Sequence, residues 1–373
     1  MQGAPAIYCD YNAGAPVRAE AAVAMARALV AGGNASSIHG AGRRARALIE
    51  DAREMLAAHI EARAENVVFT SGATEALHLA LASAGAASLI ISAVEHDAVY
   101  EHAVRAQARI APVDAHGIVQ MEALAALLAA AAKPALVAVQ LANSETGVLQ
   151  PIGTIATLCR ENGAMLLVDA AQALGRVAVG MLDLDASYLV LSSHKIGGPP
   201  GAGLLALAPG APFAAARFGG GQERGRRPGT ENMPAIAGFG VAATWAVREM
   251  ASEAPRLAAM RDRFEAHLPS GAAVFGAGAP RLPNTSNFAI PGLAAETAVI
   301  AMDLEGVALS SGSACSSGKV RASRVLSAMG VAPDLARCAL RVSFGHESRE
   351  DDVDAALAAL TRVLARRASG AAA

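Results

Sequence analysis

The sequence of 373 residues has almost no excess of charge of either sign, because 31 lysines and arginines stand against 33 aspartates and glutamates. Nucleic-acid-binding proteins usually carry a basic excess. The chain also lacks an uncharged apolar run of about 18 residues, the length that a membrane-spanning helix needs. We therefore expect neither nucleic acid nor a membrane as a partner.

Cysteines are also few. The four, Cys9, Cys159, Cys315 and Cys338, form no C-x-x-C pair, so nothing indicates a disulfide framework or a zinc site. The first ten residues lack the basic region and apolar core of a secretory signal. We therefore expect a cytoplasmic protein without a resident metal.

What the sequence does contain is an alternation of apolar strands and amphipathic helices, and 53% of its residues are hydrophobic. The predicted strands of the first part are 66–70, 89–92, 136–139, 165–168 and 188–191. The predicted helices between and before them include 17–31, 43–60, 71–84, 121–132 and 155–161. This order predicts a mostly parallel sheet covered on both faces. After residue 250 a second region follows, with helices at 257–268 and about 351–366 and strands at 286–290, 307–310 and 340–344.

Polar residues follow these strands where each one ends, which is where ligands bind in open α/β sheets. They are His96, Asn143, Asp169, Gln172 and Lys195. A partly desolvated lysine can attack an aldehyde and hold it as a Schiff base, and pyridoxal phosphate (PLP) is the usual aldehyde. Asp169 could pair with the protonated pyridine nitrogen of that cofactor. An ordinary solvated lysine and a capping aspartate are the alternatives.

Three loops are candidates for binding groups. Residues 71–76 open a helix directly after a strand, where free N–H groups and a small glycine suit a phosphate. Residues 219–230 form a basic loop that is either solvated or supplies Thr230 to a phosphate across a subunit boundary. The polar loop 34–40 either carries binding groups or caps the next helix through Ser36 or Ser37.

Cys315 lies in a run of small polar residues, 310–319, unlike Cys159 and Cys338, which are expected to be small apolar fillers. Nothing near Cys315 in the sequence would bury its thiol. We therefore expect an exposed thiol on a movable segment, which is suited to nucleophilic attack and to carrying a product away.

Taken together, the motifs resemble those of a known family, in the same order and from Tyr8 to about His346. They are 71–75, Glu95-His96, 143–147, Asp169 with Gln172, Ser192 with His194-Lys195, Gly229-Thr230, 310–315 and 341–345. The chain resembles the NifS/IscS-like cysteine desulfurases of the class V aminotransferase-like, PLP-dependent family. It departs from the family pattern at Gly14-Ala15, Ala35, Pro200 and Arg321-Ala322.

The resemblance implies an α/β protein with the PLP-dependent transferase fold of type I. A large PLP-binding domain, 13–249, would hold a mostly parallel seven-stranded sheet. A smaller α+β domain, 1–12 and 250–373, would carry the active-site cysteine loop, 310–321.

The same resemblance implies the site residues. The catalytic residues would be Lys195, Cys315 and His96. The residues that bind the cofactor would be Ala73, Thr74, His96, Asn143, Asp169, Gln172, Ser192, His194, Lys195 and Thr230. Those near the substrate would be Asn34, Asn143 and Arg341, with the arginine gripping the substrate carboxylate.

The implied reaction converts L-cysteine to L-alanine and leaves the sulfur on Cys315 as a persulfide. The implied partners are a second copy of the chain and a sulfur-acceptor or iron–sulfur scaffold protein, with which Cys315 could transiently ligate a cluster. The alternatives are a selenocysteine lyase, a cysteine sulfinate desulfinase, a class V aminotransferase, or a binding protein that keeps the fold without activity.

Overall fold

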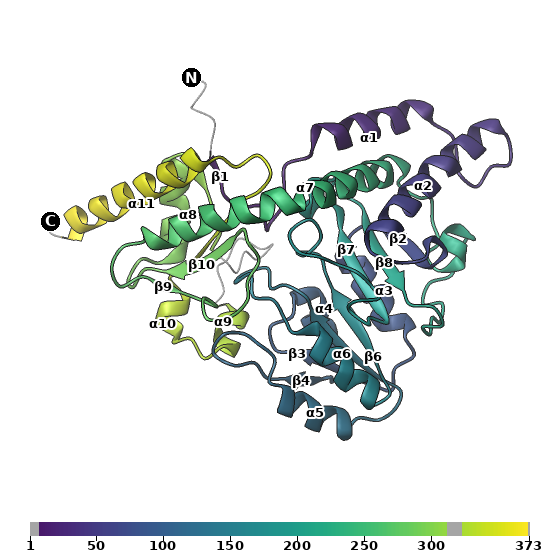
Figure 1. Ribbon diagram of the computed structural model, residues 1–373, viewed down its shortest axis with the longest axis horizontal. Coiled ribbons are helices and arrows are strands. Elements are labelled where there is room, and N and C mark those ends of the chain that lie inside the picture. The colour runs from purple at the N-terminus through teal and green to yellow at the C-terminus, as the bar shows by residue number, and fades with distance from the viewer. Residues whose placement is uncertain (1–6, 312–322, 372–373) are drawn as a thin grey trace.

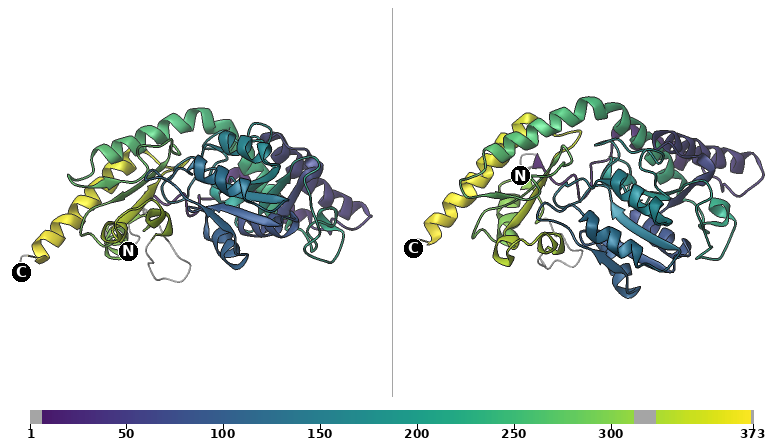
Figure 2. Two further views of the ribbon diagram at one scale, coloured as in Figure 1. Left: turned by 90° about the horizontal axis from the view of Figure 1, so that it is seen from below. Right: turned by 60° about the horizontal axis from the view of Figure 1, so that its bottom comes forward.

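The computed structural model describes residues 7–311 and 323–371, and its long helix α7 (Met233–Ala266) runs through both halves of the molecule (Figure 1). The predicted active-site thiol, Cys315, lies outside the described residues. One half is built around a seven-stranded sheet, and the other around a three-stranded sheet with one helix packed along the far part of α7. Figure 2 shows α7 arching over the molecule with α11 (Glu350–Ala371) alongside it.

The large sheet has the strand order β2-β8-β7-β6-β5-β3-β4. Its strands are β2 (Val67–Thr70), β3 (Ser88–Ser92), β4 (Arg109–Ala111), β5 (Ala135–Gln140), β6 (Ala164–Asp169), β7 (Tyr188–Ser192) and β8 (Gly203–Leu207). Strands β3 to β7 run parallel to their neighbours, whereas β8 is antiparallel to both β7 and β2. The prediction of a mostly parallel seven-stranded sheet is confirmed, although strands β4 and β8 had not been identified from the sequence.

Both faces of this sheet are buried, and side chains alternate between them along each strand. In β5, Val137 and Val139 belong to one hydrophobic cluster, and Leu136 and Ala138 belong to the other. The period of two follows from the pleat of a strand. The first face is covered by α1 (Ala19–Ala31), α2 (Gly40–His59), α5 (Met121–Ala129), α6 (Ile152–Glu161) and the first part of α7, and the second by α3 (Ala73–Ser83) and α4 (Asp97–Arg105).

The second half contains a smaller antiparallel sheet in the order β12-β10-β9. Its strands are β9 (Ala273–Val274), β10 (Thr285–Ala289) and β12 (Ala339–Ser343), and a separate parallel pair joins β1 (Ile7–Tyr8) to β11 (Val307–Ala308). Its helices are α8 (Ala295–Leu304), α9 (Arg324–Ala328), α10 (Pro333–Ala336) and α11. The pairing of β1 brings the start of the chain into this half.

Helix α7 contributes to two separate hydrophobic clusters. Its side chains up to Ala246 pack in the cluster of the large sheet, and those from Leu257 onward pack in the cluster of the small sheet. The predicted domain boundary at 249/250 therefore lies within one continuous helix, between its two packing surfaces. The division into 13–249 and 1–12 with 250–373 stays a prediction, which this change of packing partner supports. Helix α9 differs, because Val325 and Leu326 pack in the cluster of the large sheet.

Among the described residues, no helix is both long enough and apolar enough to cross a membrane. The same residues contain no group of three or more histidine, cysteine, aspartate or glutamate side chains placed to hold a metal ion.

Candidate active site

A cavity of about 770 Å³ lies at the carboxyl ends of the parallel strands, between the large sheet and side chains from β12 and α9. The predicted site residues that line it are Ala73, Thr74, His96, Asn143, Asp169, Gln172, Ser192, His194, Lys195 and Arg341. Asn34 and Thr230 are exposed and do not line this cavity in their own chain. Their roles, like that of Cys315, stay predictions.

Lys195 ends a short 3-10 helix, η2 (Ser193–Lys195), that directly follows β7. Its ammonium donates hydrogen bonds to the backbone carbonyls of Asn12 and Ala13, at 2.5 and 3.0 Å. Burial, together with the positive charges of Arg341 and Arg176, lowers the pKa of Lys195 to about 8. A substantial fraction of this amine is therefore neutral near pH 8, as nucleophilic attack on an aldehyde requires.

Asp169 is the last residue of β6 and is almost completely buried. Its carboxylate accepts a hydrogen bond from the N–H of Ala171 at 3.0 Å. Burial raises the pKa of Asp169, and this hydrogen bond and the positive charges of His96 and Lys195 act against that rise. A cationic group bound next to the carboxylate would be strongly stabilised, because burial leaves little solvent to screen the attraction.

The polar atoms of the Gln172 and Asn143 side chains form hydrogen bonds to other groups of the protein. The amide of Gln172 donates to the carbonyl of Asn12 at 2.9 Å and accepts from Arg176 at 2.5 Å. The Oδ1 atom of Asn143 accepts from the N–H groups of Glu145 and Thr146, and its Nδ2 donates to a backbone carbonyl. Both side chains therefore also shape the cavity wall.

His96 is the N-cap residue of α4, and its Nδ1 accepts a hydrogen bond from the N–H of Ala98 at 3.1 Å. This bond leaves Nε2 to carry the proton of the neutral ring. The residue before it, Glu95, is completely buried, and its Oε2 has no hydrogen-bond partner among the described residues. Burial and then the charge of Asp169 raise the pKa of Glu95 to about 8, although the N–H of Gln140 opposes this. The sequence motif had named Glu95 without a role.

The cavity has an anion-binding end at the start of α3. The N-cap residue, Gly72, makes no side-chain cap, so the first N–H groups of the helix, including those of Ala73 and Thr74, have no intrahelical acceptor. Across from them, a Cβ atom on Gly203 of β8 would lie 2.4 Å from the Gly72 backbone, so only glycine fits there. Ser192 lies within 2.9 Å of Nδ1 of His194 at the same end.

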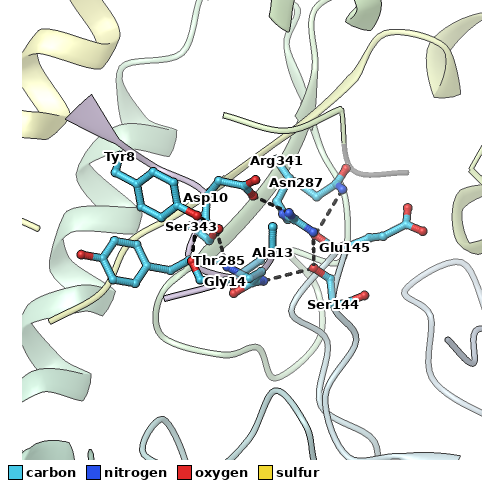
Figure 3. Close-up of polar contacts among 12 residues, drawn as sticks. Tyr8, Asp10, Ala13, Gly14, Ser144, Glu145, Thr285, Asn287, Arg341 and Ser343 are labelled. Carbon is cyan, nitrogen blue, oxygen red and sulfur yellow. Dashed lines mark hydrogen bonds and ion pairs between the residues drawn. The ribbon is translucent and has the colours of Figure 1, made fainter. Parts of the chain in front are cut away.

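The other wall of the cavity is formed by residues far away in sequence (Figure 3). The guanidinium of Arg341 on β12 donates to the carboxylate of Asp10 at 2.5 Å and to the carbonyl of Ser144 at 3.0 Å. Its Nε is buried without a partner among the described residues. Tyr8 holds the adjacent turn through a 2.7 Å hydrogen bond to the carbonyl of Gly14. Asp10 was missed as a site residue because this contact joins positions 331 residues apart.

Comparisons with known proteins agree with this geometry. The family model described as aminotransferase class-V matches residues 7–356. The cysteine desulfurase IscS of Dictyoglomus turgidum is 35% identical, with 96% of this chain and 94% of that protein covered. A cysteine desulfurase of Bradyrhizobium diazoefficiens is 39% identical, with coverage of 90% and 88%. The solved NifS-like protein from Rickettsia africae superposes with a TM-score of 0.90 at 29% identity, with coverage of 96% and 99%.

The chain therefore belongs to the aminotransferase class-V family, and within it to the NifS/IscS-like cysteine desulfurases. Members of this family depend on PLP, and the side chains of this cavity fit that group. The helix start at Ala73 and Thr74 suits its phosphate, the amine of Lys195 suits its aldehyde, and the buried carboxylate of Asp169 suits its ring nitrogen.

Proposed function

We propose that this chain converts L-cysteine to L-alanine and transfers the sulfur to its own Cys315 as a persulfide. The observation that carries the proposal is a single cavity that joins a desolvated amine, Lys195, to a buried carboxylate, Asp169, and to a guanidinium, Arg341. The names of the relatives support cysteine as the substrate, and the solved structure of SspA in complex with cysteine, 26% identical with a TM-score of 0.77 and coverage of 90% of this chain and 98% of that one, supports it further.

The protein side chains divide the work by position. When bound, PLP supplies a sink for electrons released at the substrate carbons. Lys195 would hold the cofactor and would then move a proton at the substrate Cα, while Asp169 would pair with the protonated ring nitrogen. His96 would lie next to the ring and would exchange a proton. Arg341 grips the substrate carboxylate through charged hydrogen bonds.

The sulfur step needs no external oxidant or reductant. The bond between Cβ and sulfur breaks, a new bond forms between that sulfur and the Cys315 sulfur, and Cβ gains a proton. The sum is L-cysteine plus a thiol giving L-alanine plus a persulfide. A thiolate is a suitable acceptor because it is both soft and nucleophilic.

The working form of the protein is proposed to be a homodimer. Large apolar side chains are exposed near Asn34 and the loop that precedes Thr230: Val30 at 89%, Ile38 at 90% and Phe218 at 90% exposed. This loop is fastened to its own chain by the buried ion pair of Arg53 with Glu223 and by the partly exposed ion pair of Arg227 with Glu75. Thr230 at its end is exposed and does not line its own cavity, which supports a role in the site of a second copy.

The persulfide would then be passed to an acceptor, for which we propose an iron–sulfur scaffold protein or another sulfur carrier. The cytoplasmic location stays a prediction.

Mass spectrometry of the PLP-loaded protein after exposure to L-cysteine tests the proposal. We expect the mass of one added sulfur atom on the peptide that contains Cys315, and native spectra at the mass of two chains. The peptides with Cys9 and Cys159 serve as internal controls, because burial raises the pKa of each thiol to about 12 and leaves them protonated.

A Cys315→Ala variant separates this reaction from its alternatives. Undiminished alanine formation from cysteine by that variant would contradict the persulfide step and favour a selenocysteine lyase or a sulfinate desulfinase. A fully active protein at the mass of one chain would contradict the shared site.

A further inference from the structure

Arg324, at the start of α9, extends across the cavity wall to the turn that joins β3 to α4. Its guanidinium donates to the carbonyl of Ala93 at 2.7 Å, to the carbonyl of Glu95, and to the carboxylate of Asp97 at 3.2 Å. The ring of Tyr100 on α4 lies under the guanidinium carbon, with its centroid 3.8 Å away. Neither Arg324 nor this set of contacts belongs to the motifs identified from the sequence.

All of these contacts surround one residue, His96. Two of the accepting groups, at Glu95 and Asp97, are its immediate neighbours, and the third, at Ala93, belongs to the same turn. An arginine suits this arrangement because its planar fork presents several N–H groups at once and its face stacks on an aromatic ring. The ion pair with Asp97 is exposed and contributes little, so the two carbonyl contacts and the ring contact hold the turn.

A second set of hydrogen bonds, from the large sheet and the loop after β5, also holds the turn between β3 and α4. Both Gln140 and Asn143 donate to the carbonyl of Val94, at 2.6 and 3.2 Å. Arg324 binds the carbonyls of Ala93 and Glu95 in the same turn. The imidazole of His96 therefore extends from a backbone that is held by two separate sets of hydrogen bonds. The position of that ring follows from the backbone, since its Nδ1 is already bonded to the N–H of Ala98.

The start of α9, from which the Arg324 side chain extends, is itself held in place. Ser323 caps α9 by accepting from the N–H of Leu326 at 3.0 Å, and its hydroxyl donates to the carboxylate of Glu145 at 2.6 Å. The next side chains, Val325 and Leu326, are buried in the hydrophobic cluster of the large sheet. Because the backbone at Arg324 is held in place, its guanidinium can restrain the position of the groups that it binds.

We infer that Arg324 is a positioning residue for His96, which holds the imidazole over the site where the cofactor ring binds by clamping the β3–α4 turn from the cavity side. Arg324 lines the cavity, but its N–H groups point into the turn and its cationic face is covered by Tyr100. The inference rests on the proposed role of His96. It implies that Arg324 affects the rate of the chemical step, kcat, and does not take part in substrate binding.

The test compares Arg324→Gln and Arg324→Lys in the PLP-loaded protein, with Arg337→Gln as the matched control. Arg337 is an arginine on the same half of the molecule whose side chain is 63% exposed and pairs with its near neighbour Asp334. We expect Arg324→Gln to lower kcat by about 10- to 100-fold, the scale of a small displacement of a reacting group, with KM for cysteine changed by less than about 3-fold. Arg324→Lys should recover part of the rate, and the control should equal the wild type.

Two further measurements separate positioning from a general loss of structure. In a His96→Ala background, Arg324→Gln should lower kcat by less than about 2-fold more, because both changes act through one ring. Hydrogen exchange needs no turnover, and in Arg324→Gln the amide of Ala98 should exchange about 10-fold faster than in the wild type.

Each of three results would overturn the inference. The first is a rise in KM at constant kcat, which would make Arg324 a substrate-binding residue. The second is an equal loss of rate in the presence and absence of the His96 imidazole. The third is unchanged exchange at Ala98. If the wild type makes no alanine, the exchange result still decides whether Arg324 holds the turn, and the proposed function fails separately.

Discussion

The floor of the cavity and its opposite wall are built in different ways. On the floor, Asp169, His194 and Lys195 each lie within three residues of the end of a strand of one continuous sheet. On the wall, Arg341 lies in the middle of β12 and depends on Asp10, 331 residues away. Ser323 bonds Glu145 across 178 residues. The floor therefore comes from one sheet, and the wall comes from contacts between distant segments.

This difference predicts different kinds of work for the two sides. The floor is embedded between two hydrophobic clusters, where low solvent access strengthens charge interactions and shifts pKa values. It is suited to holding the cofactor and changing its electronic state. The wall contributes the buried guanidinium of Arg341 to the cavity lining and is suited to selecting and orienting the substrate. Substitutions on the floor should therefore change chemistry. On the wall, substitution of Arg341 should change substrate recognition, whereas substitution of Arg324 should affect the chemical step through His96.

The largest effect is expected for Asp169→Asn on the floor. The amide keeps the size of the carboxylate and loses its charge, so the ring nitrogen would no longer be held protonated. We expect kcat to fall by about 10³-fold, the scale of removing one preorganised electrostatic partner, together with a shift of the cofactor absorbance band. The matched control, Asp185→Asn, removes an exposed carboxylate that pairs with Arg160 at the surface. An unshifted band with wild-type kcat would count against Asp169 as the partner of the ring.

A smaller effect, in a different kinetic constant, is expected for Arg341→Gln on the wall. Loss of a charged hydrogen bond to the substrate carboxylate costs on the order of 3 kcal/mol, or roughly 100-fold, and should appear mainly as a higher KM for cysteine. Arg341→Lys should restore only part of the affinity, because an ammonium cannot form the two parallel bonds of a guanidinium. Steady-state kinetics would contradict the assignment of Arg341 to substrate recognition if Arg341→Gln lowered kcat and left KM unchanged.

The same contrast explains what the sequence could predict. Strands buried on both faces are apolar throughout, as in 136–139, so the main sheet and the polar residues at its strand ends were identified from pattern alone. The buried state of Cys159 and Cys338 was also predicted correctly. By contrast, β8 was missed because it follows the Gly/Pro-rich loop 196–201 directly. Only the far part of α7 was identified as helical, and Pro255 within it is typical of a helix break.

The wall was only partly predictable. Arg341 was named through the family resemblance, but nothing in the local sequence relates it to Asp10. Arg324 has a role that depends on which distant segment it meets, and periodicity carries no such information. The contacts of these side chains become visible only when the segments are placed in space.

The smallest expected effect is on stability, and it concerns Lys195 on the floor of the cavity. Because the pKa of Lys195 is lowered to about 8 in the fold from its usual 10.5, the unfolded chain binds more protons than the folded one between these pH values. Stability of the cofactor-free protein should therefore rise with pH across this window, by on the order of 3 kcal/mol when complete. In Lys195→Met this contribution is absent, so the advantage of the variant over the wild type should shrink from pH 7 to pH 10 in urea unfolding. A difference that stays constant with pH would mean that the amine is not desolvated, and the floor would lose the feature that sets it apart from the wall.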